Sequence, residues 1–334
     1  MKIHYFLGER WEEEYVKTKL PNEEIIFHEG PLAASQELSD PGAEALCTFI
    51  EPHIGEEEMK RFPALKLIAT RSTGFDHIDL TAAKARGIVV VNVPSYGEHT
   101  VAEFTFALLL ALSRRVIDAD ERVRTTSTFS HDNLRGFDLS GKTIGVVGCG
   151  RIGSHVIRMA NGFDMKVLGF DTVENDDLAA TLRFTYTTLP ELFASSDIVT
   201  LHVPYNAHTH HLINRKNIHT LKKGAYLINT SRGAVVETQA LVDAIQGGTL
   251  AGAALDVLEE EGDLSDEMAL LTAPHPNEEG MKITLENHYL IQHPRVIVTP
   301  HVAFNTTEAM ERILDTTIDN IRGFAAGSPT NIVR

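Results

Sequence analysis

Three glycines in the run Thr143–Gly153 have the spacing of a dinucleotide-binding turn. The run begins as an apolar strand and then places Gly148, Gly150 and Gly153 in the pattern G-x-G-x-x-G. In such a turn the first glycine permits a tight bend, the second lets the backbone approach a pyrophosphate, and the third lets the following helix pack closely on the strand. The chemistry predicted here therefore depends on backbone N–H groups.

An acidic residue stands where this kind of turn needs one. A helical pattern over Ser154–Asn161 and a second apolar run, Lys166–Phe170, lead to Asp171, about 20 residues after Gly150. A carboxylate at that place binds the ribose hydroxyls of a dinucleotide. Thr172 and Val173 follow it, and neither is a basic residue that could receive a 2′-phosphate. The sequence therefore favours NAD over NADP.

Three further residues have charged or titratable side chains, and all three have the same kind of place in the sequence. Arg232, Glu261 and His301 each follow an apolar run in the second half of the chain. If those runs are strands of one parallel sheet, their carboxyl ends meet at one edge, where ligands bind in open α/β sheets. We therefore expect the three side chains to converge on one crevice.

The elements that must position these residues are short apolar runs separated by polar, helix-compatible stretches. Five runs come early in the chain: Lys2–Leu7, Glu24–Phe27, Ala45–Ile50, Lys66–Thr70 and Ile88–Val93. Four more follow Asp171: Asp197–His202, Gly224–Asn229, Gly252–Asp256 and Arg295–Thr299. This alternation predicts parallel sheets covered by helices on both faces, in two domains.

Several motifs together carry a family resemblance. Four of them lie between residues 148 and 304: Gly148–Gly153, Asn229–Val236, Leu255–Glu261 and Thr299–Phe304. Two precede these: Arg71–Asp79 and Asn92–Glu103. In order and spacing the motifs resemble the D-isomer-specific 2-hydroxyacid dehydrogenases, and most closely the D-lactate dehydrogenase branch. The resemblance covers nearly the whole chain.

The resemblance implies a fold as well as an activity. The fold class is α/β, with two doubly wound parallel-sheet domains, a Rossmann cofactor domain and a flavodoxin-like substrate domain, and a cleft between them. Residues 99–303 would form the NAD-binding domain, and residues 1–98 with 304–334 a discontinuous substrate domain. The crossings near 99 and 303 would be hinges whose closure excludes water.

The implied activity is reduction of a small 2-oxo acid by NADH, with pyruvate to D-lactate as the first expectation. Arg232 would clamp the substrate carboxylate and polarise the 2-oxo group. His301 would be the general acid in reduction and the base in oxidation, and Glu261 would hydrogen-bond His301 and favour its imidazolium form. Glu261 is selected only by the family's five-residue offset from Asp256, because the acidic run Glu259–Glu261 is otherwise typical of a solvated face.

The resemblance also implies binding residues on both sides of the reaction. The substrate would contact Thr73, Gly74, Tyr96, Arg232 and Phe304. The cofactor would contact Thr100, Gly148, Gly150, Arg151, Ile152, Gly153, Asp171, Val203, Pro204, Thr209, Thr230, Ser231 and Asp256.

Other functions stay open at this point. The aromatic residues Tyr96 and Phe304 favour a small, mostly apolar acid, but glyoxylate and hydroxypyruvate reduction are alternatives. A different class of function, an NAD(H)-sensing corepressor-like binding protein, is compatible with the same three side chains. The acidic, proline-containing segment Gly262–Leu285 looks like a long surface excursion and has no assigned role.

Composition limits the remaining partners. The formal net charge of −16 discourages nucleic acid and anionic membranes, and 43% hydrophobic residues suffice for packed cores. The apolar run Phe104–Leu112 is too short to span a bilayer and predicts the buried part of a helix. The N-terminal residues enter a strand pattern directly, so we expect no signal peptide and a cytoplasmic enzyme.

Cysteine and histidine usage adds little further chemistry. Cys47 and Cys149 are expected to stay reduced. His208, His210 and His211 lie in an expected loop without an acid at metal-ligand spacing, so no metal site is predicted. The helix over Ala102–Arg115 is expected at the contact of a homodimer, as the resemblance implies.

Overall fold

The computed structural model describes residues 1–35, 37–49, 53–261 and 278–333. By its internal contacts the chain divides into two compact units. The first unit comprises Met1–Tyr96 and Asn305–Arg334, and the second comprises Gly97–Phe304. No helix in the described ranges is long and apolar enough to cross a membrane.

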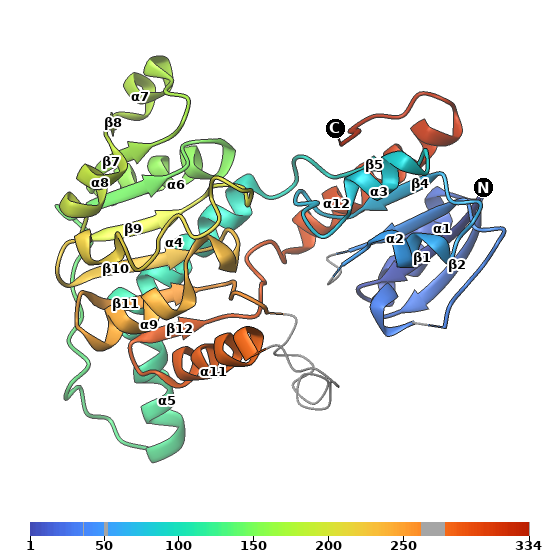
Figure 1. Ribbon diagram of the computed structural model, residues 1–334. Helices are drawn as coiled ribbons and strands as arrows, with labels where there is room; N and C mark the ends of the chain where they lie inside the picture. Colours follow the sequence, from blue (N-terminus) through green and yellow to red (C-terminus); the bar gives the residue numbers. More distant parts are fainter. Residues whose placement is uncertain (36, 50–52, 262–277, 334) are drawn as a thin grey trace. The chain divides into compact units, whose positions relative to one another are not determined.

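The first unit is built on a five-stranded parallel sheet in the order β2-β1-β3-β4-β5 (Figure 1). This is the flavodoxin-like order. The strands are β1 Lys2–Leu7, β2 Glu24–Glu29, β3 Ala45–Thr48, β4 Leu67–Thr70 and β5 Val89–Val91. All of β3 and β4 is buried, as expected for central strands covered on both faces. Ile50, the last residue of one predicted strand, lies outside the described residues.

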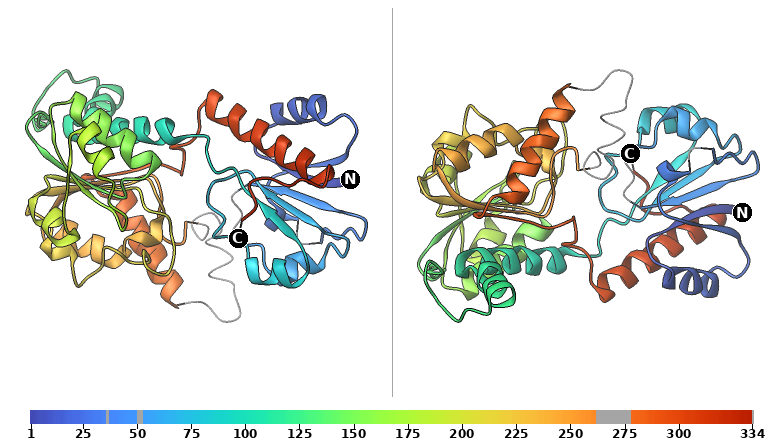
Figure 2. Two further views of the ribbon diagram at one scale, coloured as in Figure 1. Left: turned by 90° about the horizontal axis from the view of Figure 1, so that it is seen from above. Right: turned by 90° about the horizontal axis from the view of Figure 1, so that it is seen from below.

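Helices cover both faces of this sheet (Figure 2). The helices are α1 Trp11–Lys19, α2 Glu56–Lys60, α3 Leu80–Ala85 and α12 Thr307–Ala325. Apolar side chains of α12, such as Leu314 and Ile318, share one core with Tyr5 of β1, although more than 300 residues separate them in the sequence. The C-terminal helix therefore completes the core of the first unit.

The second unit is built on a seven-stranded parallel sheet in the order β12-β11-β10-β9-β6-β7-β8. Its strands are β6 Thr143–Val147, β7 Lys166–Phe170, β8 Thr185–Tyr186, β9 Ile198–Leu201, β10 Ala225–Asn229, β11 Leu250–Leu255 and β12 Val296–Val298. Strands β6 to β8 are added toward one edge of the sheet, and strands β9 to β12 are added toward the other. The point between β6 and β9, where this order reverses, is the topological switch point of a Rossmann fold.

Two layers of helices enclose that sheet (Figure 2). The helices are α4 Glu98–Arg114, α5 Val116–Thr126, α6 Arg151–Gly162, α7 Asp176–Leu182, α8 Leu189–Ser195, α9 Thr238–Gln246 and α11 Glu278–Gln292. The predicted apolar helix segment Phe104–Leu112 lies in α4, where Phe106 and Leu109 are buried. In contrast, α5 has no buried residue. The predicted fold class, two doubly wound parallel-sheet domains, is confirmed.

Candidate active site

The glycine-rich turn connects β6 to α6 and has the backbone geometry that its spacing predicts. Gly148 adopts a left-handed conformation, with φ at 93°, and a Cβ there would lie 2.6 Å from the carbonyl oxygen of His202. A Cβ on Gly153 would lie 1.9 Å from the carbonyl oxygen of Gly148. Neither position has room for a side chain, so both glycines are required for the turn to pack.

Gly150 differs from the other two glycines. A Cβ there would have no heavy atom within 4 Å, and α6 begins at the next residue. Protein packing does not require a glycine at this place, whereas a ligand that approaches the backbone at the helix N-terminus would. The turn therefore fits a dinucleotide pyrophosphate.

Asp171 follows β7 and contacts the same turn. Its Oδ2 accepts a hydrogen bond of 2.8 Å from the backbone N–H of Cys149, and its Oδ1 accepts one of 3.2 Å from the N–H of Val173. The carboxylate is thus held beside the glycine-rich turn, where a ribose would lie. Burial raises the pKa of the Cys149 thiol to about 12, so this cysteine stays protonated at neutral pH.

The other residues expected at the cofactor lie around the carboxyl ends of the central strands. Val203, Pro204 and Thr209 belong to the segment after β9, where the Thr209 hydroxyl donates to the carbonyl oxygen of Pro204 at 2.6 Å. Thr230 and Ser231 follow β10. The Thr230 hydroxyl is 3.1 Å from that of Thr105 in α4, and the Ser231 hydroxyl donates to Asn229 Oδ1 at 2.7 Å. Arg151 and Ile152 open α6, and Thr100 is buried in the first turn of α4.

His301 and Glu261 form the most distinctive pair of the site. His301 Nδ1 is 2.8 Å from Glu261 Oε1, and the side chains are 21% and 40% exposed, respectively. His301 has a left-handed backbone, with φ at 53°. Residues other than glycine adopt this conformation infrequently, and those that do cluster at active sites. One nitrogen of the ring is therefore oriented by a carboxylate, which leaves Nε2 as the atom that can exchange a proton with a substrate.

Asp256 holds the turn that carries His301. This buried residue directly follows β11, and its carboxylate accepts hydrogen bonds from the Thr299 hydroxyl at 2.6 Å and from the backbone N–H groups of Val302 and Ala303 at 3.0 and 2.8 Å. The N–H of His301 donates to the carbonyl oxygen of Asp256 at 2.8 Å. Burial raises the pKa of the Asp256 carboxyl, while these hydrogen bonds act in the opposite direction.

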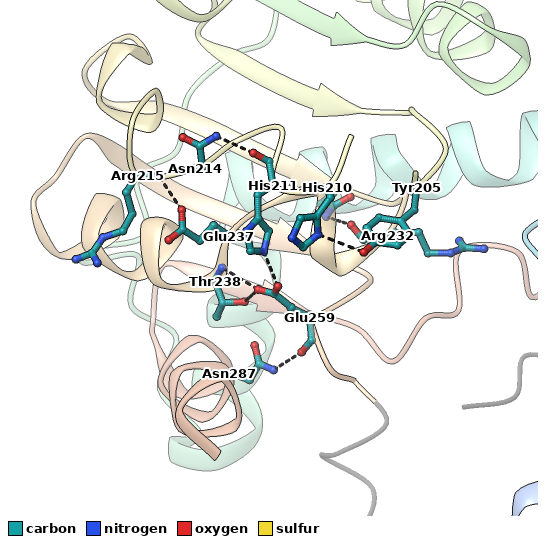
Figure 3. A network of polar contacts seen from close by, with 11 residues as sticks. Tyr205, His210, His211, Asn214, Arg215, Arg232, Glu237, Thr238, Glu259 and Asn287 are labelled. Atoms are coloured by element: carbon teal, nitrogen blue, oxygen red, sulfur yellow. Dashed lines mark hydrogen bonds and ion pairs between the residues drawn. The ribbon is translucent and has the colours of Figure 1, made fainter. Parts of the chain in front are cut away.

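Arg232 lies on the neighbouring loop, after β10. Since β10, β11 and β12 are adjacent parallel strands, the loops that bear Arg232, Glu261 and His301 leave the same edge of the sheet. The Arg232 Nη1 donates to the carbonyl oxygen of Ser231 at 2.9 Å. The guanidinium extends away from the polar network at the base of its loop (Figure 3).

Three residues expected at the substrate belong to the first unit. The Thr73 hydroxyl donates to the carbonyl oxygen of Val93 at 2.8 Å, and the Gly74 carbonyl oxygen accepts from the Ser72 hydroxyl at 2.6 Å. Tyr96 ends the first segment of this unit. Phe304, in contrast, ends the second unit, where its ring meets that of His301 edge-on with centroids 6.4 Å apart.

One residue of the site had no predicted role. Glu259 belongs to the acidic run that is typical of a solvated face, yet it is only 8% exposed and joins several loops through its carboxylate (Figure 3). Its partners are distant in the sequence, so neither periodicity nor composition reveals them.

Among the described residues, no group of three or more His, Cys, Asp or Glu side chains is arranged to hold a metal ion. The site instead combines a dinucleotide turn, an oriented histidine and an arginine at one edge of a Rossmann sheet. This combination of groups is typical of an enzyme that transfers a hydride between a dinucleotide and a small anion.

Comparison with known proteins agrees with this geometry. Residues 106–303 match the family model described as D-isomer specific 2-hydroxyacid dehydrogenase, NAD binding domain. A glyoxylate reductase of Thermofilum pendens is 40% identical and covers 83% of this chain and 77% of its own length. A D-lactate dehydrogenase of Treponema pallidum is 34% identical and covers 96% of this chain and 93% of its own length.

The solved structures give the same family. The crystal structure of D-lactate dehydrogenase from Aquifex aeolicus, complexed with NAD and lactic acid, has a TM-score of 0.85 and 36% sequence identity. It covers 98% of this chain and 96% of its own. The chain therefore belongs to the D-isomer-specific 2-hydroxyacid dehydrogenases, an NAD-dependent oxidoreductase family.

Proposed function

We propose that this protein reduces a small 2-oxo acid to the D-2-hydroxy acid with NADH, and that pyruvate is its main substrate. The observation that carries the proposal is the pair formed by His301 and Glu261, 2.8 Å apart, at the carboxyl edge of a Rossmann sheet. The pair orients one proton-carrying nitrogen at the place where such sheets bind their ligands.

His301 acts as the general acid and base. In reduction its Nε2 gives a proton to the developing alkoxide, and in oxidation the same atom accepts the hydroxyl proton. Glu261 holds Nδ1 and stabilises the imidazolium that forms during oxidation. The turn held by Asp256 keeps the ring in place during this exchange.

Arg232 binds the substrate carboxylate and polarises the 2-oxo group, because a guanidinium offers several donors in one plane. Thr73 and Gly74 offer backbone N–H groups to the same carboxylate. Tyr96 and Phe304 line the apolar side of the substrate. The first unit, Met1–Tyr96 with Asn305–Arg334, serves as the substrate domain, and the second unit, Gly97–Phe304, serves as the cofactor domain.

When bound, NADH supplies the hydride that reduces the 2-oxo carbon. The chain's own residues bind and orient it. Gly148, Gly150 and Gly153 shape the turn for the pyrophosphate, and Asp171 accepts hydrogen bonds from the adenosine ribose. The remaining contacts come from Thr100, Arg151, Ile152, Val203, Pro204, Thr209, Thr230, Ser231 and Asp256.

The choice of pyruvate rests on the aromatic residues Tyr96 and Phe304 and on the likeness to D-lactate dehydrogenases over nearly the full chain. Glyoxylate is the second candidate, since a relative of 40% identity is a glyoxylate reductase. We further propose that the enzyme acts in the cytoplasm as a homodimer. The contact was expected on Ala102–Arg115, in α4, but Phe106 and Leu109 of that helix are buried within the second unit. We place the contact instead on α5 and the segment after it, which expose apolar side chains.

The test is turnover of purified protein with pyruvate, glyoxylate, hydroxypyruvate and phenylpyruvate, followed by loss of NADH absorbance, with NADPH in a parallel series. We expect pyruvate to give the highest kcat/KM and NADH to be preferred. His301→Ala should lower kcat by about 10²- to 10⁴-fold and leave NADH binding nearly unchanged. The exposed His219→Ala serves as the matched control.

The reverse reaction tests the stereochemistry. With NAD, the protein should oxidise D-lactate and not L-lactate. Highest kcat/KM with glyoxylate would replace pyruvate as the substrate and keep the enzyme class. NADH binding without turnover of any of these acids would contradict the proposal and favour a sensing role.

A further inference from the structure

Glu259 is a buried carboxylate at the base of the loops that carry the candidate catalytic groups (Figure 3). Its Oε2 accepts hydrogen bonds from the backbone N–H and the hydroxyl of Thr238, at 3.1 and 2.8 Å, in the first turn of α9. Its Oε1 lies 2.6 Å from Nε2 of His211, in the segment after β9. One side chain thus joins segments that follow three adjacent strands, β9, β10 and β11.

The backbone at Glu259 is fixed from two further directions. Asn287 of α11 is fully buried, and its Nδ2 donates to the carbonyl oxygen of Glu259 at 2.7 Å. On the other side, a Cβ on Gly233 would lie 2.0 Å from the carbonyl carbon of Leu258 and 2.2 Å from the amide nitrogen of Glu259. The residue next to Arg232 therefore packs directly on the peptide that precedes Glu259.

His211 connects the same loops a second time. Its backbone N–H donates to the carbonyl oxygen of Ala234 at 2.8 Å, and its left-handed φ of 48° turns its side chain toward Glu259. Its ring stacks on that of His210, with centroids 3.9 Å apart. The segment after β9 is consequently tied both to the loop that carries Arg232 and to Glu259.

This network lies close in sequence to the candidate catalytic residues. Glu261, which contacts His301, lies two residues after Glu259, and Arg232 lies one residue before Gly233. Any movement of the Leu258–Glu259 peptide shifts both groups. Misplacement of reacting groups by about 1 Å can cost about 10²-fold in rate.

We propose that Glu259, with His211, is a positioning residue that sets the geometry of Arg232 and of the pair formed by Glu261 and His301. The inference deepens the proposed function and rests on it. Glu259 touches neither substrate nor cofactor in this role; it acts by tying the loops after β9, β10 and β11 to the bodies of α9 and α11. Loss of the Glu259 carboxylate is costly because the two donors of Thr238 would be left without an acceptor.

The experiment compares Glu259→Ala, Glu259→Gln and His211→Ala with Glu260→Ala, an exposed neighbour of the same charge. Glu259→Ala should lower kcat by about 100-fold. Glu259→Gln should recover most of that loss, because the amide oxygen can still accept from Thr238. His211→Ala should lower kcat by about 10-fold, and Glu260→Ala should retain wild-type kcat.

Amide hydrogen exchange separates positioning from general destabilisation and does not depend on turnover. In Glu259→Ala, exchange should rise in residues 230–238 and 256–261 and stay unchanged in strands β6 and β7. Unchanged exchange in those two loops, or a kcat per folded enzyme within about twofold of wild type, would overturn the inference. If Glu259→Ala does not fold, His211→Ala decides by the same two measurements.

The same experiment separates failure of the proposed function from failure of the positioning role. A wild type that turns over none of the acids refutes that function, and the exchange data then decide the structural part alone. A wild type that is active, with Glu259→Ala equally active and equally protected, refutes only the positioning role.

Discussion

At the residue scale, His202 is a neutral histidine held directly behind the glycine-rich turn. It follows β9, its Nε2 is 2.9 Å from the Thr200 hydroxyl, and its Nδ1 is buried without a hydrogen-bond partner among the described residues. Burial lowers the pKa of His202 to about 3. The folded protein thus keeps this ring neutral at pH values where the unfolded chain binds a proton.

This difference predicts acid-sensitive stability with a definite sign. Between the unfolded pKa of about 6.5 and the folded value of about 3, the unfolded state binds more protons, so stability falls as the pH falls. His202→Gln cannot titrate. It should be less stable than wild type at pH about 7.5, where its packing is worse, and should lose less stability on going to pH about 4.5.

Urea unfolding at the two pH values, for both proteins, measures this effect. His219→Gln, an exposed histidine, is the control and should follow wild type at both pH values. Equal losses of stability in wild type and His202→Gln would contradict the assignment of the effect to His202.

Three consecutive glutamates illustrate what the sequence can and cannot predict at this scale. Glu261 is correctly placed beside His301, but only because the family resemblance selects it. The expectation of a solvated face is wrong for Glu259, whose partners Thr238 and His211 are 21 and 48 residues away in the sequence. Contacts of that kind depend on strand order, which local patterns do not contain.

At the element scale, the connection between β6 and α6 depends on how closely the helix approaches the turn. The Cβ that Gly153 lacks would stand 1.9 Å from the Gly148 carbonyl oxygen, and the obstacle is backbone, which cannot move aside cheaply. Gly162, at the other end of α6, has no heavy atom within 4 Å of such a Cβ. Close packing therefore requires a glycine at position 153 and does not require one at position 162.

We expect Gly153→Ala to push α6 away from the turn, to weaken NADH binding at least tenfold and to lower the midpoint of thermal unfolding. Gly162→Ala should leave NADH binding unchanged and stabilise the protein by about 0.5 kcal/mol, because alanine is a better helix former. Fluorescence titration with NADH and thermal unfolding check both variants. Wild-type NADH affinity in Gly153→Ala would contradict the packing argument.

Most strands could be predicted because buried parallel strands are continuous apolar runs. The exceptions have physical causes. Strand β8 has only two residues, Thr185 and Tyr186, paired with Leu168 and Gly169, and so leaves no run to detect. Helix α5 has no buried residue, so its sequence lacks the apolar periodicity that reveals other helices.

At the scale of the whole molecule, the alternation of strands and helices predicts two parallel-sheet domains, and both sheets are present. The position of the C-terminal helix shows the limit of such patterns. Local patterns do not say which sheet α12 packs on. Only the family resemblance places residues 304–334 with the N-terminal segment, and α12 does share a core with Tyr5 in the first unit. The part of the acidic excursion at residues 262–277 lies outside the described residues.

The exposed surface around α5 supports the last prediction, which concerns assembly. Val116 and Ile117 are about half exposed, and Phe129, in the segment after α5, is 96% exposed. These residues all belong to one segment of the chain, and exposed apolar patches typically mark an association site, most often between identical chains related by a twofold axis.

Wild-type protein should therefore have the mass of a dimer in size-exclusion chromatography with light scattering, and Ile117→Asp combined with Phe129→Ser should shift it to the mass of a monomer. Leu285→Asp provides the control, because Leu285 is an exposed apolar residue on another helix, α11, and an aspartate there should leave the dimer intact. A monomeric wild type, or a double variant that remains dimeric, would exclude α5 as the subunit contact. Because an aspartate at a buried contact would remain without a partner charge, the expected dissociation is strong enough to be seen at micromolar concentration.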